Sequence, residues 1–438
     1  MAIEFALSPE QREQQLVARV FAGEVLAGVP RAIAGLETPE ERFDALRPFY
    51  EQMVAAGFLH AVPDPTGHGS GTGLVGTALM VEELTAVDVN VPLTLLSNRV
   101  AIDPIVAGGT PAQVDLLLAP LRTESEAPLA GFAFGEVDAS DDWDDPDPEA
   151  GLRTVARRED DEWVINGWKQ SVRNGYGWHG VGADLYTVAC RTDPSRPARE
   201  TMTIIAVPGG TPGIHITGSR DTAGHVAAIS SRIHFDDVRV PADNMIGRPG
   251  DGAELITRAF AGTAAIVGAI CVGVMRAAFD CALSFARAGS TPMVEHQGIG
   301  YLLADIKTRI EAVRSLTWRA CDAVERSGGR DFELAAASKV FASETAVEVV
   351  WDCMRVVGAD AYSLHLPLAG LLQDVIAYPL FEGSNMGVRR RHLQSLLSSE
   401  RYDPLATMAV PAATEPDSDG RVRQAVVQQH TAFTAALS

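Results

Sequence analysis

Residues 234–244 read His-Phe-Asp-Asp-Val-Arg-Val-Pro-Ala-Asp-Asn, and the chain changes character on either side of them. Apolar and charged side chains alternate through Val238, Arg239 and Val240, as they do in a strand that is buried on one face. Pro241 ends the alternation, and residues from Gly252 onward carry a helical pattern instead. We therefore interpret this stretch as the last strand of a β-domain that leads into a set of helices.

Outward from this strand, the sequence divides into three regions and a tail. Residues 129–241 hold short apolar or alternating runs separated by Gly, Pro and Asp, which is typical of a small β-domain. Residues 1–128 carry helical signals, and residues 242–400 carry long helical stretches rich in small residues, as in a four-helix bundle. Residues 401–438 form a tail of lower apolar content. The pattern predicts an α+β protein of several domains.

Particular residues mark two of the expected helices. Ser8-Pro9-Glu10-Gln11 combines a capping box with proline at the first helical position, so a helix is expected to begin there. Gly262, Gly268 and Gly273 recur within the apolar segment Ile256–Ala286. Because glycine inside a helix costs stability, we expect these three to permit close approach to another helix or to a ligand. The same apolar segment predicts self-association through the bundle, as a homodimer or homotetramer.

Composition excludes several classes of protein. The 438 residues carry a formal net charge of −21 at pH 7, which argues against binding to nucleic acid or to an anionic membrane surface, since both require clustered Lys and Arg. There is no run of about 18 uninterrupted apolar residues, and the acidic N-terminus is unlike a secretory signal. Five widely spaced cysteines and scattered histidines predict neither disulfides nor a metal site. We expect a cytoplasmic protein without a metal ion.

A candidate catalytic carboxylate lies in Phe381-Glu382-Gly383-Ser384, where an apolar run meets a glycine break. Apolar neighbours remove water from the Glu382 carboxylate, which favours the neutral form and is expected to raise its pKa. A carboxylate of this kind is able to take a weakly acidic proton near neutral pH. The alternative is a surface glutamate at a helix break, and a Glu-Gly dipeptide by itself does not decide between the two.

Several stretches resemble motifs of the acyl-CoA dehydrogenase family, and they occur in the family's order. They are Gly57–Pro63, Glu82–Leu84, Trp163–Lys169, His234–Asn244, Val294–Gln297 and Phe381–Ser384. The resemblance extends over almost all of residues 5–400 and implies an N-terminal helical domain, a small β-barrel domain and a C-terminal four-helix bundle. It also implies that Glu382 removes a proton next to a thioester, while FAD between the β-domain and the bundle accepts a hydride.

The resemblance assigns residues to the FAD site, and some of them depart from the family's pattern. The assigned positions are Glu136, Asp141, Ser171, Arg173, Arg287, Gln297, Arg355, Gly358 and Ser384. Ser171 and Arg173 stand where the family has a tryptophan against the flavin and a hydroxyl at its N5 edge. Asp141 replaces a hydroxyl and begins an acidic run, which we interpret as a solvated loop or, at the substrate entrance, as a surface that repels coenzyme A phosphates. The FAD pyrophosphate is expected to reach the neighbouring subunit.

The resemblance therefore implies an FAD-dependent dehydrogenase that introduces an alpha,beta double bond into a small acyl thioester, carried by coenzyme A or by a carrier protein. Two alternatives remain open because the cofactor positions are altered. One is a lyase, isomerase or cyclase that uses Glu382 as acid and base without a redox step. The other is a non-catalytic or half-site subunit of a hetero-oligomer.

Overall fold

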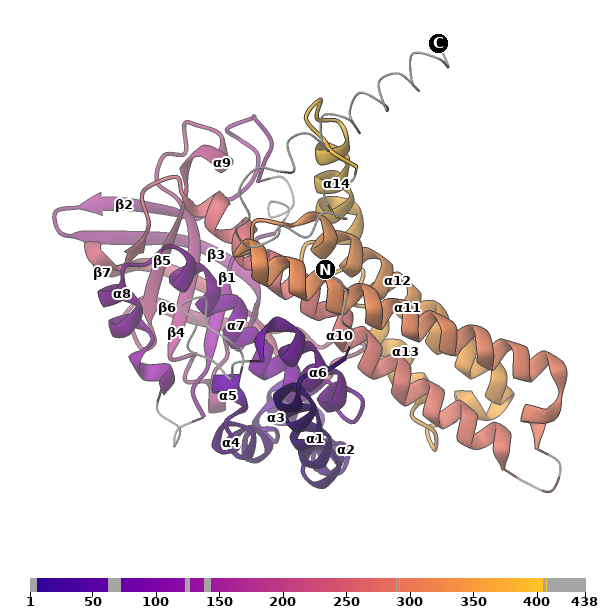
Figure 1. Cartoon of the computed structure of the whole chain (residues 1–438). Coiled ribbons are helices and arrows are strands. Elements are labelled where there is room, and N and C mark those ends of the chain that lie inside the picture. Colours follow the sequence, from indigo (N-terminus) through magenta and orange to yellow (C-terminus); the bar gives the residue numbers. More distant parts are fainter. Residues whose placement is uncertain are drawn as a thin grey trace, which may run out of the picture. The chain divides into compact units, whose positions relative to one another are not determined.

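The chain folds into an N-terminal helical region, a β-sheet and a C-terminal helical bundle, in the order that the sequence predicts (Figure 1). This computed structural model describes residues 6–61, 72–122, 127–137, 143–288 and 292–404, together with residues 290 and 407. Residues up to Leu396 form one packed unit, and residues from Leu397 onward form a second.

The N-terminal helices begin where the sequence supplies capping side chains. In chain order they are α1 (Pro9–Glu24), α2 (Val29–Ile33), α3 (Pro39–Asp44), α4 (Arg47–Ala55), α5 (Phe58–Ala61), α6 (Gly73–Thr85), α7 (Asn90–Gly108) and α8 (Pro111–Leu117). The capping box predicted for α1 is confirmed: the Gln11 N–H donates to Ser8 Oγ at 3.1 Å, and the Ser8 N–H donates to Gln11 Oε1 at 3.0 Å. Thr38 and Thr110 cap α3 and α8 in the same way.

The β-domain is one sheet with the strand order β6-β7-β3-β2-β4-β5-β8, and β1 pairs in parallel with β4. Its strands are β1 (Ala130–Ala133), β2 (Val155–Glu159), β3 (Glu162–Arg173), β4 (Leu185–Arg191), β5 (Met202–Pro208), β6 (Ile214–Ser219), β7 (Ser230–Pro241) and β8 (Met245–Ile246), with the short helix α9 (Ala198–Thr201) before β5. The stretch at residues 234–244 supplies the end of β7, as expected, and β7 pairs antiparallel with β3. The pairing is irregular between Lys169 and Val172, where Ser171 has a φ of 58°.

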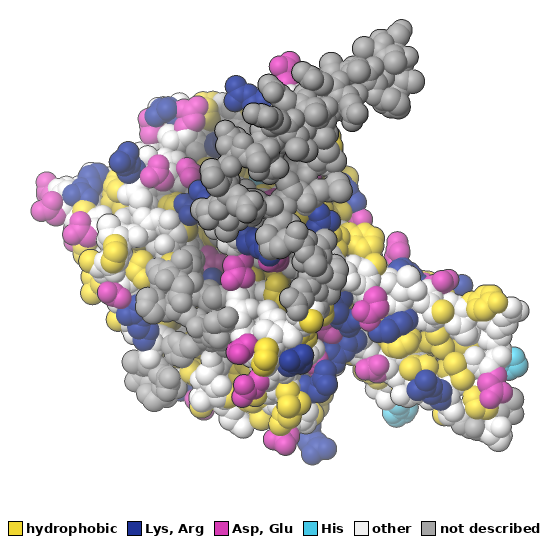
Figure 2. All heavy atoms as spheres, viewed as in Figure 1, with side chains coloured by type: hydrophobic (Ala, Val, Ile, Leu, Met, Phe, Trp, Pro, Cys, Tyr) yellow, Lys and Arg dark blue, Asp and Glu magenta, His cyan; other side chains and the backbone are white. Residues whose placement is uncertain are grey.

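The bundle is built around α10, which packs against α6, α11 and α12. Its helices are α10 (Gly252–Arg287), α11 (Gln297–Ser327), α12 (Glu333–Val357), α13 (Leu368–Val375) and α14 (Arg390–Leu397), and the π-helical turn Asn385–Arg389 precedes α14. α10 is long and apolar enough to cross a membrane, but most of its apolar stretch is buried inside the protein. It is therefore a core helix. Charged side chains of both signs are interspersed over the described part of the face in Figure 2.

A buried ion-pair cluster joins the N-terminal region to the bundle. Glu82 and Glu83 on α6 are buried and pair with arginines of three other helices. Arg276 of α10 contacts both carboxylates, at 2.7 and 2.9 Å, while Arg314 of α11 pairs with Glu82 at 2.9 Å and Arg19 of α1 with Glu83 at 2.8 Å. Burial raises the pKa of Glu83, but the hydrogen bonds and charges of Arg19 and Arg276 outweigh it and lower that pKa to about 2. The pairs fix the orientation of α6 against α10.

The three glycines of α10 serve two different purposes. A Cβ at Gly268 would lie 2.2 Å from Thr317 Oγ1, and one at Gly273 would lie 2.1 Å from Thr85 Oγ1, so these two glycines permit close helix contact as predicted. A Cβ at Gly262 would meet nothing within 4 Å, because Gly262 faces a cavity. The apolar face of α10, which we expected to serve self-association, packs largely against other helices of the same chain. Large apolar side chains are exposed elsewhere on the bundle surface, at Trp351, Tyr362 and Leu364.

Candidate active site

Glu382 lies in a strained turn at the end of the bundle. Its φ is 54°, and Gly383 follows with a φ of 65°, so two successive residues adopt the left-handed conformation. Such a conformation is unfavourable for glutamate and persists only where surrounding contacts hold it, which is common at functional sites. A Cβ at Gly383 would also lie 3.3 Å from Arg389 Cζ. The predicted glycine break is therefore required both by the backbone angle and by the close approach of Arg389.

Arg389 holds this turn in place. Its Nε and Nη2 donate to the main-chain carbonyl of Glu382 at 2.9 and 2.5 Å. The guanidinium is buried and lies over the rings of Phe332 and Phe260, at 5.0 and 5.8 Å from their centroids. Burial lowers the pKa of Arg389 to about 10, and the nearby Glu382 charge opposes that change. Arg389 therefore keeps its positive charge at neutral pH.

The carboxylate of Glu382 is oriented by a hydroxyl from the core helix. Thr263 on α10 donates through Oγ1 to Glu382 Oε2 at 3.0 Å. Among the residues that the structure describes, no donor is bonded to Oε1, and the half-buried carboxylate lines the cavity. One oxygen is thus held while the other is available to a substrate proton.

Two further cations lie close to this carboxylate. Arg173, at the end of β3, donates through Nη1 to the Ala228 carbonyl at 2.9 Å, and its guanidinium lies 5.8 Å from the centre of the Phe381 ring. Burial lowers the pKa of Arg173, and the charge of Glu382 opposes the shift. Lys339 on α12 donates to Asn385 Oδ1 at 2.7 Å, and burial, followed by repulsion from Arg389, lowers its pKa to about 8. Cations therefore outnumber the carboxylate, which favours an anion in the site.

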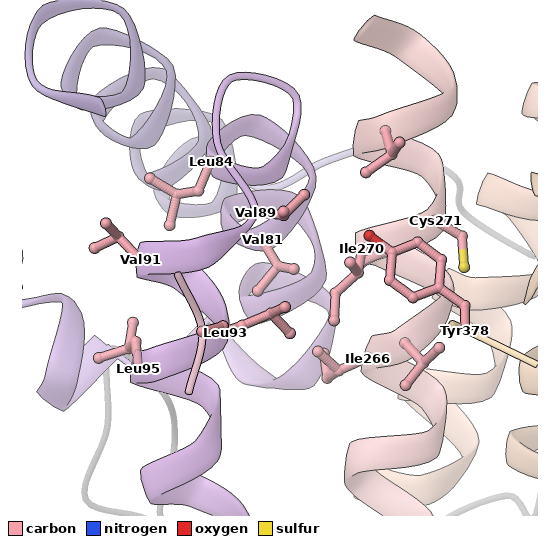
Figure 3. Packing of buried hydrophobic residues seen from close by; sticks show 14 of the residues in the cluster. Val81, Leu84, Val89, Val91, Leu93, Leu95, Ile266, Ile270, Cys271 and Tyr378 are labelled. Carbon is pink, nitrogen blue, oxygen red and sulfur yellow. The ribbon is translucent and has the colours of Figure 1, made fainter. Parts of the chain in front are cut away.

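Buried polar groups lie behind the base. Tyr378 is fully buried beside Ile270 and Cys271 of α10 (Figure 3), and the ring of His225 stacks on it with centroids 5.2 Å apart. The main-chain N–H of His225 donates to Asp374 Oδ1 at 2.7 Å. Burial raises the pKa of Asp374 to about 7, and burial with repulsion from Arg173 lowers the pKa of His225 to about 3. His225 is thus neutral and contributes no charge to the site.

A cavity of about 460 Å³ extends from Glu382 between α7, α10 and the end of α11. Its wall is largely apolar, and Figure 3 shows Leu93 of α7 extending toward Ile266 and Ile270 of α10. Charged side chains also line it: Arg99 pairs with Asp103 at 2.6 Å, while Arg258 lines the cavity further toward the start of α10. The space suits a small, mainly apolar molecule.

The residues where β1 meets β3 fit the ring of a flavin. Phe132 and Phe134 are half-buried and stack at 5.7 Å, with Phe260 of α10 edge-on to both. The backbone of Gly135 approaches that of Gln170, so this aromatic shelf adjoins the irregular part of β3. Exposed Ser171 and half-buried Arg173 there supply a hydroxyl and a cation, which are able to donate hydrogen bonds to a flavin edge.

Two other predicted cofactor residues are already bonded within the chain. Glu136 is buried, pairs with Lys169 at 2.6 Å and accepts the N–H groups of Arg153 and Thr154. Ser384 accepts the Gly387 N–H at 2.9 Å and so starts the π-helical turn. Their contact with FAD stays a prediction, and Asp141 lies outside the described residues. In the acidic run that follows, Asp144 pairs with Arg391 at 3.1 Å, and no residue of 143–149 lines the cavity.

The residues predicted for the pyrophosphate do not gather at the cavity. Arg287, Gln297 and Arg355 are exposed, with Gln297 bonded to Tyr301 and Arg355 to Asp352, and Gly358 ends α12 with a φ of 77°. None of them lines the space around Glu382. Their contact with the FAD pyrophosphate, and its reach to a neighbouring subunit, stay predictions.

Sequence reasoning missed four polar residues of the site: Thr263, Arg389, Lys339 and Arg258. Thr263 lies 119 residues from Glu382, and no local pattern links the two. Arg389 is seven residues after Glu382 and opens the basic run Arg389-Arg390-Arg391, but it was not assigned to the site. No local pattern in the sequence signals that its side chain bonds back to Glu382.

The fold and the site define a flavoenzyme. Three models of the acyl-CoA dehydrogenase family match the chain: the N-terminal domain at residues 8–125, the middle domain at 139–238 and the C-terminal domain at 250–396. The chain belongs to the acyl-CoA dehydrogenase family, and FAD is its cofactor.

Its relatives include enzymes with two kinds of substrate. A nitroalkane oxidase of Podospora anserina is 36% identical over 92% of this chain and 98% of its own length. A cyclohexane-1-carbonyl-CoA dehydrogenase of Geobacter metallireducens is 31% identical over 73% of this chain and 82% of its own length. A structure of flavoprotein nitroalkane oxidase superposes with a TM-score of 0.87 at 34% identity, covering 92% of this chain and 99% of that chain. In that flavoprotein an aspartate and an arginine have roles in the reaction.

Proposed function

We propose that this flavoenzyme oxidises nitroalkanes, with Glu382 removing a proton from the carbon that bears the nitro group. The observation that carries the proposal is the position of Glu382: its carboxylate lines a largely apolar cavity of about 460 Å³, with the half-buried Arg173 and the buried Arg389 close by. An acid and an arginine occupy this turn, as an aspartate and an arginine act in the related oxidase.

The charges of the site suit this proton transfer. Removal of the proton from a nitroalkane places negative charge on the nitro oxygens, giving a nitronate. Arg173 lines the same cavity as Glu382, so its guanidinium is placed to stabilise that charge. Thr263 keeps the carboxylate turned toward the cavity, much as another structure of the related oxidase identifies a serine in its active site. When bound, FAD supplies the oxidising equivalents of the reaction.

The single chain carries the whole proton-transfer apparatus. Thr263 and Arg389 of the same chain both bond to Glu382, so the half-site alternative gains no support. The family's flavin chemistry likewise favours a redox reaction over the lyase, isomerase or cyclase alternative.

A direct comparison of substrates tests the proposal. The FAD-loaded protein is incubated with 1-nitrohexane in air, and nitrite release and oxygen consumption are followed. We expect both to proceed together and to cease when Glu382 is changed to Gln. The proposal is wrong if 1-nitrohexane yields no nitrite under conditions in which FAD is fully bound.

One observation favours a second function, the oxidation of a small acyl thioester. The base here is glutamate, the residue that the sequence resemblance assigns to acyl-CoA dehydrogenases, whereas the related oxidase is known for an aspartate. The longer side chain would reach a proton next to a thioester carbonyl. Reduction of a dye by the protein and a short acyl-CoA, without nitrite from 1-nitrohexane, would select this function instead.

A further inference from the structure

Arg258 differs from the other charged side chains that line the cavity. Its Nε is buried and has no hydrogen-bond partner, and among the described residues no carboxylate pairs with its guanidinium. The other groups are engaged: Arg99 pairs with Asp103 at 2.6 Å, and Glu325 Oε2 accepts the Leu74 N–H at 3.0 Å. A buried charged donor without a partner is costly, so a partner from outside the chain would be favoured.

The position of Arg258 relates it to the base. Arg258, Gly262 and Thr263 all face the cavity from α10, and Thr263 is the residue bonded to Glu382. Five residues separate Arg258 from Thr263, which is about 7.5 Å along a helix that rises about 1.5 Å per residue. Gly262 leaves the wall between them open, since a Cβ there would touch nothing within 4 Å. A short alkyl chain therefore has room to lie between the guanidinium and the carboxylate.

We infer that the substrate carries a second, anionic group, a carboxylate at the end of its alkyl chain, which Arg258 binds. This inference rests on the proposed function and makes the substrate class an ω-nitroalkanoate. The planar guanidinium presents parallel N–H donors that match the two oxygens of a carboxylate. The apolar wall of Leu93, Ile266 and Ile270 then encloses the methylene groups between the two polar ends.

Kinetics with two substrates of equal chain length test the inference. We compare kcat/KM of the FAD-loaded enzyme for 6-nitrohexanoate and 1-nitrohexane, in the native protein and in Arg258→Gln. A charge-assisted hydrogen bond contributes about 1.5–3 kcal/mol, so the preference for the acid should fall by about tenfold or more in Arg258→Gln, mainly through KM. Arg326→Gln is the control, because Arg326 is exposed on α11, pairs with Asp322 and does not line the cavity, and it should leave the ratio unchanged. An equal ratio in native protein and Arg258→Gln would overturn the inference.

Binding without turnover separates this inference from the proposed function. Calorimetry measures hexanoate and hexanamide binding to the FAD-loaded native protein and to Arg258→Gln. Tighter binding of hexanoate that disappears in Arg258→Gln supports the anion site even if no nitro compound is oxidised, in which case only the proposed function fails. If 1-nitrohexane is oxidised but hexanoate binds no better than hexanamide, the proposed function stands and the anion site is wrong.

Discussion

The two ends of the cavity differ in how their polar groups are satisfied. At the Glu382 end, Thr263 holds the carboxylate and Arg389 holds the main-chain carbonyl. At the other end, Arg258 lines the same cavity with its Nε unbonded. Under the proposed function, the two ends have different roles. The chemistry would be done at the Glu382 turn, whose polar groups are bonded within the chain, while Arg258 would select substrates by binding their anionic group.

The largest loss of activity is expected when the carboxylate of Glu382 is removed. Glu382→Gln keeps the size and the bond from Thr263, but it has no carboxylate to accept a proton. Loss of a general base typically costs about 100- to 10,000-fold, so nitrite release should fall by that factor. Bound FAD, followed by its visible absorbance, and the circular dichroism of the helices should be retained. Near-native turnover in a folded, FAD-loaded variant would place the base elsewhere.

Arg389 tests whether the strained turn depends on its buried partner. Arg389→Met leaves the Glu382 carbonyl without its two donors, and an unsatisfied buried acceptor costs about 1–3 kcal/mol of unfolding free energy. Urea unfolding of the FAD-loaded protein measures the loss. Arg390→Met is a matched control, because Arg390 pairs with Glu344 where both side chains are about 40% exposed, and such pairs contribute about 0–1 kcal/mol. Equal losses for the two variants would contradict the proposed role of Arg389.

Features of the fold and of the Glu382 site that depend on neighbouring residues could be predicted from the sequence, while those that depend on residues far along the chain could not. The capping box of α1, the strand at residues 234–244 and the glycine break at Gly383 were predicted because each is local. Arg389 was missed because it ends the π-helical turn Asn385–Arg389, and no local pattern in this sequence signals that turn. The burial of α10 likewise depends on helices far along the chain, against which much of its apolar face packs, and a subunit contact through this helix stays a prediction.

Loss of the hydrogen bond from Thr263 to Glu382 should lower activity less than loss of the carboxylate itself. Thr263→Val keeps the shape of the side chain but removes the donor to Glu382 Oε2. Hydrogen bonds to charged groups contribute about 1.5–3 kcal/mol, and misorientation of the base should lower kcat by about tenfold or more. Thr257→Val is the control on the same helix, because the Thr257 hydroxyl bonds to the Ala253 carbonyl one turn earlier and Thr257 does not line the cavity. A similar decrease in both variants would mean that helix stability, not orientation of the base, is affected.

The buried carboxyl group of Asp374 should make the stability of the protein depend on pH. Because the folded pKa of Asp374 is raised to about 7, above its ordinary value of 3.8, the folded state binds the proton more tightly than the unfolded state. The resulting stability is fully present below about pH 3.8 and is lost progressively as pH rises to about 7. Asp374→Asn keeps an acceptor for the main-chain N–H of His225 and removes the charge, so it should gain stability over native protein at about pH 8.5 but little at about pH 4. Urea unfolding at both pH values measures this, and an equal difference at the two pH values would contradict it.

The smallest expected effect is a change in stability at Gly262, which lines the cavity between Arg258 and Thr263. Gly262→Ala adds a methyl group where nothing lies within 4 Å, so the helix preference for alanine should stabilise the protein by about 0.5–1 kcal/mol. Gly268→Ala makes the same change where the added Cβ would lie 2.2 Å from Thr317 Oγ1, and it should destabilise the protein because α11 must move. Thermal unfolding of the two FAD-loaded variants compares them. If Gly262→Ala destabilises the protein as much as Gly268→Ala does, the cavity does not continue between Glu382 and Arg258, and the two ends cannot serve one substrate.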